Sequence, residues 1–430
     1  MFIPKSPRAC DGLVYTDSPL IHDPYLPGRW QRNSRDGNAI NSDVFDRTRN
    51  MLKYEKPMLQ SIAQHSQKSL MLDPHVPLLA RPGWLPDGPL PLSRVALAWE
   101  KPEASEEEMR AFFEPARQMT RAYWKPYGEA YDTYHELISH IERPATRLFF
   151  NGSSYRLLDI LVRNSGVGAT DADVILTFTA GRYFDALDTT DVLGYETAML
   201  MVTATGGSGS PMNGPYRRWL GAPFDLHRRC AIPGVCTLTI RRGCPAARFI
   251  LHERDPEKVA LSQGVAHVTP AGEFQPRNLS IVADASDLNL WDSISREYAE
   301  EFLGVQHDQG QPLDEHDDQL TRDMRAALDD ARRSGRLTLS YLGVGLDPLT
   351  WKPEILTTAV FDGDTFDAIF GDIVLENDEG RLIFADYNNA RGIPFTEDDI
   401  RYWAHGRMLA AGEACLYLAW KYRQMLMIDS

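Results

Sequence analysis

The most regular pattern in the chain lies between residues 236 and 304, where short apolar runs give way to a helix. Cys236–Arg242 and Arg248–Arg254 are two such runs, and the five residues GCPAA separate them. This spacing predicts a β-hairpin. Val265–Thr269 predicts a third strand. The apolar periodicity over Leu288–Gly304 predicts a helix that packs on the same sheet.

The flanking segments alternate between strand and helix patterns. Downstream, we expect helices at Asp318–Arg333 and Thr396–Met427, the latter interrupted near Gly406, and a strand at Leu337–Gly343. Upstream, the expected elements are strands at Arg147–Phe150, Tyr155–Val162 and Asp173–Ala180 and a helix at Thr190–Thr203. This mixture predicts an α+β fold for residues 146–430, with a strand-rich lead-in over 146–225.

The first 145 residues have a different sequence pattern. Residues 1–43 predict an extended arm, and helical spacing follows over Ser42–Ser69. After a proline-rich crossing, Ser105 and Glu108 match a capping box at the start of a helical stretch that prolines interrupt. We therefore expect a helical, proline-interrupted N-terminal region at residues 1–145. A separate region is consistent with the two to three domains expected for a chain of 430 residues.

Composition excludes several classes of function. The 45 basic and 60 acidic residues give a formal charge of −15, so we expect no nucleic-acid partner. No apolar run approaches the roughly 20 residues of a membrane helix, and no secretory signal is visible, so we expect no membrane association. Five scattered cysteines indicate a reducing compartment, and we predict a cytoplasmic protein.

Three carboxylates on one helix face carry the main chemical signal. Glu297, Glu300 and Glu301 stand at i, i+3 and i+4 within REYAEEFLG. Like charges at this spacing destabilise a bare helix. Mg²⁺ binds through carboxylate oxygens and would relieve that repulsion. The three glutamates are therefore candidate ligands of Mg²⁺.

This stretch resembles the Nudix box of nucleoside-diphosphate-X hydrolases. Pro270, Ala271 and Gly272 correspond to the family's turn, and Arg296 with the three glutamates corresponds to its helix. The resemblance implies a Nudix-like α/β/α sandwich. The 23 residues between Gly272 and Arg296 exceed the family's interval.

A longer resemblance covers about 280 residues from Tyr155 through GIPFTEDDI. Here the chain is similar to the region that follows the DNA-binding domain in bacterial helix-turn-helix transcriptional regulators. The N-terminal residues of this chain contain no evident helix-turn-helix.

Together these features predict a Mg²⁺-dependent hydrolase of a nucleoside-diphosphate-linked or related phosphoanhydride. Glu297, Glu300 and Glu301 would bind the metal, Glu300 and Glu301 would be catalytic, and Arg248 or Arg254 would bind substrate phosphate. Two alternatives stay open. One is a noncatalytic ligand-sensing or regulatory protein, and the other is a biosynthetic enzyme that uses the scaffold for different chemistry. The expected partner is a small molecule, and a homodimer stays open.

Three further clusters have both a functional and a structural interpretation. His227, Cys230, Cys236 and Cys244 could bind zinc or be ordinary side chains and free thiols. His135 and His140 diverge by about 140° on a helix, so we expect surface histidines rather than a zinc pair. Asp185, Asp188 and Asp191 either line a pocket or cap helix starts.

Overall fold

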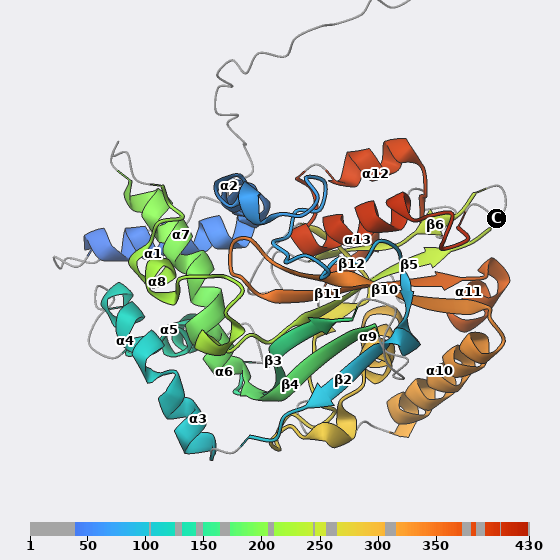
Figure 1. Cartoon of the computed structure of the whole chain (residues 1–430), viewed down its shortest axis with the longest axis horizontal. Coiled ribbons are helices and arrows are strands. Elements are labelled where there is room, and N and C mark those ends of the chain that lie inside the picture. The colour runs from blue at the N-terminus through green and yellow to red at the C-terminus, as the bar shows by residue number, and fades with distance from the viewer. Residues whose placement is uncertain are drawn as a thin grey trace, which may run out of the picture. The chain divides into compact units, whose positions relative to one another are not determined.

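A computed structural model gives the fold of the chain (Figure 1). It describes residues 39–102, 105–124, 131–142, 149–163, 173–204, 210–243, 246–254, 265–305, 315–371, 380–383, 392–404 and 406–428. Contacts between Cα atoms place residues 40–430 in one unit. Most of the predicted arm, Pro126, Cys244 and half of the predicted strand at Arg147–Phe150 lie outside the described residues.

The largest sheet, sheet A, has seven strands in the order β1-β10-β11-β5-β6-β13, with β9 also paired to β5. Strand β11 pairs with β5 in parallel, and the other pairings are antiparallel. The bounds are β1 Leu90–Pro91, β5 Gly234–Arg241, β6 Arg248–Phe249, β9 Ala271–Glu273, β10 Leu337–Leu346, β11 Pro353–Phe361 and β13 Ile393–Pro394.

Two three-stranded sheets accompany sheet A. Sheet B has the order β2-β4-β3 and sheet C the order β12-β7-β8. The bounds are β2 Val95–Trp99, β3 Ser153–Val162, β4 Val174–Arg182, β7 Leu251–Arg254, β8 Ala266–Val268 and β12 Gly380–Ile383. In sheet B, the main-chain nitrogen of Tyr155 donates to the carbonyl of Phe274, just beyond β9. This hydrogen bond joins sheet B to the part of sheet A near β9.

Helices cover both faces of sheet A (Figure 1). On one face, α9 (Leu290–Leu303) contacts β5, and α10 (Glu315–Arg333) contacts β10. On the other face, α13 (Ala410–Lys421) packs on β5 and β11. Two separate apolar clusters follow from this layering, because Tyr298 of α9 belongs to one cluster and Cys415 of α13 to the other.

The remaining helices range from four to 16 residues. An aromatic group formed by Trp124, Tyr134 and Tyr195 joins several of the N-terminal ones, with ring centroids 5.1–5.4 Å apart. Their bounds are α1 Ala39–Tyr54, α2 Lys56–Ser66, α3 Glu106–Phe112, α4 Glu114–Thr120, α5 Tyr134–Glu142, α6 Tyr183–Ala186, α7 Val192–Thr203, α8 Pro215–Leu220, α11 Gly363–Ile369 and α12 Glu397–Ala404.

The predicted hairpin is correct only at its tip. Ile240 and Arg241 of β5 pair with Phe249 and Arg248 of β6. After Phe249 the chain leaves sheet A, and Leu251–Arg254 pairs with β8 and β12 in sheet C. The single predicted strand at Arg248–Arg254 is therefore two strands in two sheets.

The α+β class is confirmed, and so is the predicted helix on sheet A, which is α9. The predicted capping box is also present, because Ser105 and Glu108 hydrogen-bond each other's main-chain nitrogen. Strands β1 and β2 stand within the N-terminal region for which we expected helices. Since β2 pairs with β4, the described parts of residues 1–145 and 146–430 share sheet B.

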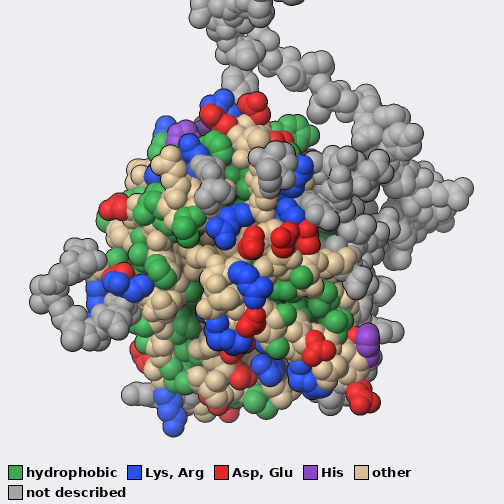
Figure 2. All heavy atoms as spheres, turned by 90° about the vertical axis from the view of Figure 1, so that its right-hand side faces the viewer, with side chains coloured by type: hydrophobic (Ala, Val, Ile, Leu, Met, Phe, Trp, Pro, Cys, Tyr) green, Lys and Arg blue, Asp and Glu red, His purple; other side chains and the backbone are tan. Residues whose placement is uncertain are grey.

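Charges of both signs are mixed on the surface near α10. Arg322 pairs with Asp318 and Arg336 pairs with Asp330. Figure 2, which views the side of the molecule where α10 lies in Figure 1, shows basic and acidic side chains next to one another among apolar ones. Within the described residues, no helix combines the length and apolarity needed to cross a bilayer.

Candidate functional site

Helix α9 is fixed at both ends by its own sequence. Oδ1 of Asn289 accepts hydrogen bonds from the main-chain nitrogens of Trp291 and Asp292 at 2.9 and 3.2 Å, which caps the N-terminus. Gly304 ends the helix in the left-handed region at φ 70°. The side chains that anchor α9 to the core are all buried: Leu290, Ile294, Tyr298 and Phe302.

Glu301 is buried and bound by the chain itself. Its carboxylate accepts a hydrogen bond from Oγ1 of Thr269 at 2.6 Å and one from the main-chain nitrogen of Ala271 at 2.7 Å. Only 3% of the residue is exposed. Both carboxylate oxygens therefore tie α9 to the turn between β8 and β9.

Glu297 lies against β9, the strand that follows this turn. A Cβ atom added at Gly272 would collide with the carboxylate of Glu297, so the carboxylate packs directly on the backbone of β9. One residue earlier, Arg296 donates to the carbonyl oxygen of Gln275 at 2.7 Å. Strand β9, the segment after it and the start of the acidic motif are thus in direct contact. Glu300, the third predicted ligand, is half-buried.

The three predicted metal ligands do not converge as a triad. Among the described residues, no group of three or more His, Cys, Asp or Glu side chains has the geometry to hold a metal ion. Glu301 does not join such a group because its carboxylate is hydrogen-bonded to Thr269 and Ala271.

A chain of polar contacts leads from α9 to a lysine that the sequence did not single out. Nε2 of Gln275 donates to Oε2 of Glu273 at 3.1 Å, and Nζ of Lys352 lies 2.9 Å from Oε1 of Glu273. Lys352 directly precedes β11, and Glu273 ends β9. Glu354, the second residue of β11, pairs with Gly234 of β5, which pairs in turn with Glu273. We call Asp191, Glu273, Lys352 and Glu354 the lysine cluster; all four residues are partly buried.

The lysine cluster shifts the protonation of its members. Burial raises the pKa of Glu354 to about 7, although Lys352 opposes the shift. Burial likewise raises the pKa of Asp191 to about 6, again against the effect of Lys352. Burial would lower the pKa of Lys352, but Glu273, Glu354 and Asp191 together raise it above its ordinary value. The cluster therefore pairs a persistent cation with two acids that titrate near neutral pH.

The other predicted residues occupy separate places. Arg248 donates to the carbonyl oxygen of Gly392 at 3.0 Å, and the side chain of Arg254 lies outside the described residues. Of the suggested zinc set, Cys230 and Cys236 are buried and His227 is exposed. The thiol of Cys236 lies 3.4 Å from Oε2 of Glu354 and 3.5 Å from Nε2 of His267.

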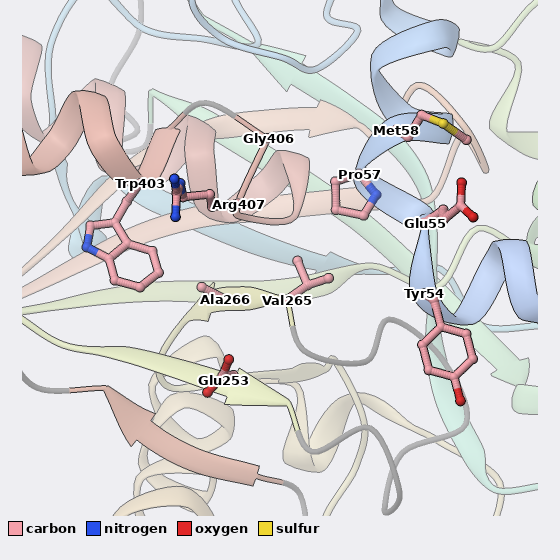
Figure 3. Close-up of a pocket in the computed structure, with 10 residues that line it drawn as sticks. All are labelled: Tyr54, Glu55, Pro57, Met58, Glu253, Val265, Ala266, Trp403, Gly406 and Arg407. Carbon is pink, nitrogen blue, oxygen red and sulfur yellow. The ribbon is translucent and has the colours of Figure 1, made fainter. Parts of the chain in front are cut away.

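A surface pocket of about 500 Å³ opens beside α2 (Figure 3). Trp403 and Arg407 lie on one side of it, and Tyr54 lies on the other. Glu253 of β7 forms part of its wall. As far as the described residues show, its lining includes none of the α9 glutamates and no member of the lysine cluster.

Comparison of the sequence with models of known protein families finds none that matches, and comparison with curated proteins finds no similar chain.

Proposed function

We propose that residues 146–430 form a Nudix-like α/β/α unit that hydrolyses a small phosphoanhydride with the help of Mg²⁺. The observation that carries the proposal is the contact of Glu297 with Gly272, which brings the acidic helix against β9, the strand that takes the place of the expected turn at Ala271 and Gly272. The bond from Arg296 to Gln275 reinforces this strand–helix contact. The helices on both faces of sheet A are also consistent with such a scaffold.

Glu297 and Glu300 fit the donor set that Mg²⁺ requires. They are three residues apart on one helix face, and Mg²⁺ is commonly held by one or two carboxylates, with water and substrate phosphate completing its shell. A bound Mg²⁺ would polarise a phosphate and acidify a water molecule. Glu301 takes a different role in this proposal. It is a positioning residue, because its oxygens hold α9 to Thr269 and Ala271.

A second candidate function is acid–base chemistry on the same scaffold without phosphoanhydride cleavage. The observation in its favour is Glu354, whose pKa of about 7 suits a group that exchanges protons near neutral pH. Lys352 next to it would orient an acceptor group of the substrate. The noncatalytic alternative keeps the fold and binds ligand without turnover.

One assay tests the proposed hydrolase. Phosphate and pyrophosphate release would be measured from a panel of nucleotides and sugar nucleotides with Mg²⁺ or EDTA, for wild type, Glu300→Gln and Glu354→Gln. We expect Mg²⁺-dependent release that falls at least 100-fold in Glu300→Gln. Glu107→Gln, at an exposed position on α3, is the matched control and should behave as wild type.

The remaining outcomes count against the hydrolase. Release in EDTA that only Glu354→Gln abolishes would assign the cleavage to the lysine cluster rather than to a metal on α9. No release from the panel, combined with ligand-induced stabilisation of the wild type, would favour the noncatalytic alternative.

A further inference from the structure

A second pocket, of about 250 Å³, lies among the N-terminal helices. Its lining comes from α3, α4, α5 and α6 and from the segment before β3. The residues are Arg110, Arg117, His135, Asn151, Phe184 and Asp185. The sequence predicted a surface position for His135, but only 8% of it is exposed. That prediction is wrong because an aspartate 53 residues away holds the ring inside.

Asp188 orients the imidazole of His135. Its Oδ2 lies 2.8 Å from Nδ1 of His135, and its Oδ1 accepts the main-chain N–H of the same residue at 3.0 Å. The ring also stacks on Phe184, with centroids 4.5 Å apart. Because the carboxylate of Asp188 is also bonded to Arg117, it acts as an acceptor, and Nδ1 carries the proton.

The opposite ring nitrogen of His135, Nε2, is available to a ligand. The described part of the chain gives Nε2 no hydrogen-bond partner, although the residue is more than nine-tenths buried. Since His135 lines the pocket, this nitrogen is a polar atom that a bound molecule can reach. In the tautomer fixed by Asp188, Nε2 accepts a hydrogen bond.

Arg110 is the exposed cation of the pocket, and it interacts electrostatically with Asp185, which also lines the pocket and is bonded to Arg117. Arg117 is satisfied by Asp185 and Asp188 and by the carbonyl oxygen of Arg110. The side chain of Arg110 itself is exposed at the pocket. One end of the pocket therefore offers a guanidinium group, and the interior offers an acceptor nitrogen beside an aromatic ring.

We propose that this pocket binds a small hydroxylated phosphate, with the phosphate on Arg110 and a hydroxyl group donating to Nε2 of His135. A volume of about 250 Å³ suits a small metabolite rather than a dinucleotide. Guanidinium groups bind phosphate oxygens through paired N–H donors. The site is independent of the α9 glutamates, so it stands whether or not the proposed hydrolase does.

Calorimetry on the full chain tests this site, with glucose 6-phosphate and inorganic phosphate as separate probes. We expect glucose 6-phosphate to bind the wild type with a Kd of 1 mM or tighter, and inorganic phosphate, which lacks the carbon-borne hydroxyl groups, to bind at least 10-fold more weakly. Arg110→Ala and His135→Asn should each weaken glucose 6-phosphate binding at least 10-fold. Asparagine can still donate to Asp188 in place of Nδ1 but provides no group equivalent to Nε2.

Arg121→Ala is the matched control, because Arg121 is an exposed arginine paired with Asp132 outside the pocket lining. It should bind as wild type does, and the melting temperature of Arg110→Ala should be unchanged. The NMR signal of the His135 imidazole is identified by its absence from the spectrum of His135→Asn. In the wild type, this signal should shift when glucose 6-phosphate is added. No binding of either probe at 10 mM, or equal binding by wild type, Arg110→Ala and His135→Asn, would overturn the proposal.

Discussion

The ammonium group of Lys352 lies 2.9 Å from Oε1 of Glu273, which joins the residue before β11 to the last residue of β9. Both side chains are about three-quarters buried. The two residues are 79 positions apart in sequence, and the strands β9 and β11 next to them both flank the start of β5. This pair is the centre of the lysine cluster, and it connects through Gln275 to the acidic helix.

Removing Lys352 should destabilise the fold. In Lys352→Met, the carboxylates of Glu273, Glu354 and Asp191 lose their shared cation in a partly buried place. We expect a loss of about 2–4 kcal/mol in the free energy of unfolding. Lys421→Met is a matched control, since Lys421 pairs with Asp73 at the same 2.9 Å but is 43% exposed. It should cost less than about 1 kcal/mol. Urea denaturation measures both losses. Equal losses in the free energy of unfolding for Lys352→Met and Lys421→Met would contradict a stabilising role of Lys352 in a buried cluster.

Glu354→Gln should change how stability depends on pH. The pKa of Glu354 is raised from 4.5 to about 7, so its ionisation costs more in the folded state than in the unfolded one. That cost is absent below pH 4.5, grows as the pH rises, and is complete above pH 7. We expect the variant to gain up to about 3 kcal/mol over wild type at pH 8 and nothing at pH 4.5. Thermal melts of both proteins across this pH range measure the difference in stability. A difference between Glu354→Gln and wild type that does not vary with pH would contradict the raised pKa.

Neighbouring glutamates on α9 should respond differently to the same substitution. Glu301→Gln replaces one acceptor oxygen with a donor group beside Thr269 and Ala271, and we expect a loss of about 1–3 kcal/mol. Glu300→Gln changes a half-buried side chain and removes like-charge repulsion, so its stability without metal should stay within about 0.5 kcal/mol of wild type. Chemical denaturation in EDTA compares the two. A larger loss in Glu300→Gln would reverse their assigned roles.

Local patterns predicted α9 well because its determinants are local. Asn289 and Gly304 set its ends within two residues of the predicted bounds, and four apolar side chains at helical spacing set its buried face. The break at Ile250 could not be found in the same way. The run from Arg248 to Arg254 looks continuous in sequence, and only the distant partners β8 and β12 divide it.

The candidate sites show the same limit. Glu297 and Glu300 were found because a helix repeats every few residues, so spacing alone places their side chains together. Lys352, Glu273 and Glu354 meet through the pairing of β5 with β9 and β11, which the sequence pattern does not disclose. The sequence wrongly predicts a surface position for His135 for the same reason, since its partner Asp188 comes from another segment. For Asp185, Asp188 and Asp191 the sequence leaves both a pocket and helix capping open, and of the three Asp185 lines the second pocket.

The most direct test of the proposed hydrolase is Mg²⁺ binding, measured by titration calorimetry on the metal-free full chain. We expect wild type to bind Mg²⁺ at one site, and Glu297→Gln and Glu300→Gln each to lose that binding while melting at the temperature of wild type in EDTA. Glu107→Gln should bind Mg²⁺ as wild type does. Identical Mg²⁺ heats from wild type, Glu297→Gln and Glu300→Gln would contradict a metal site on α9, and the proposed hydrolase would fall with it.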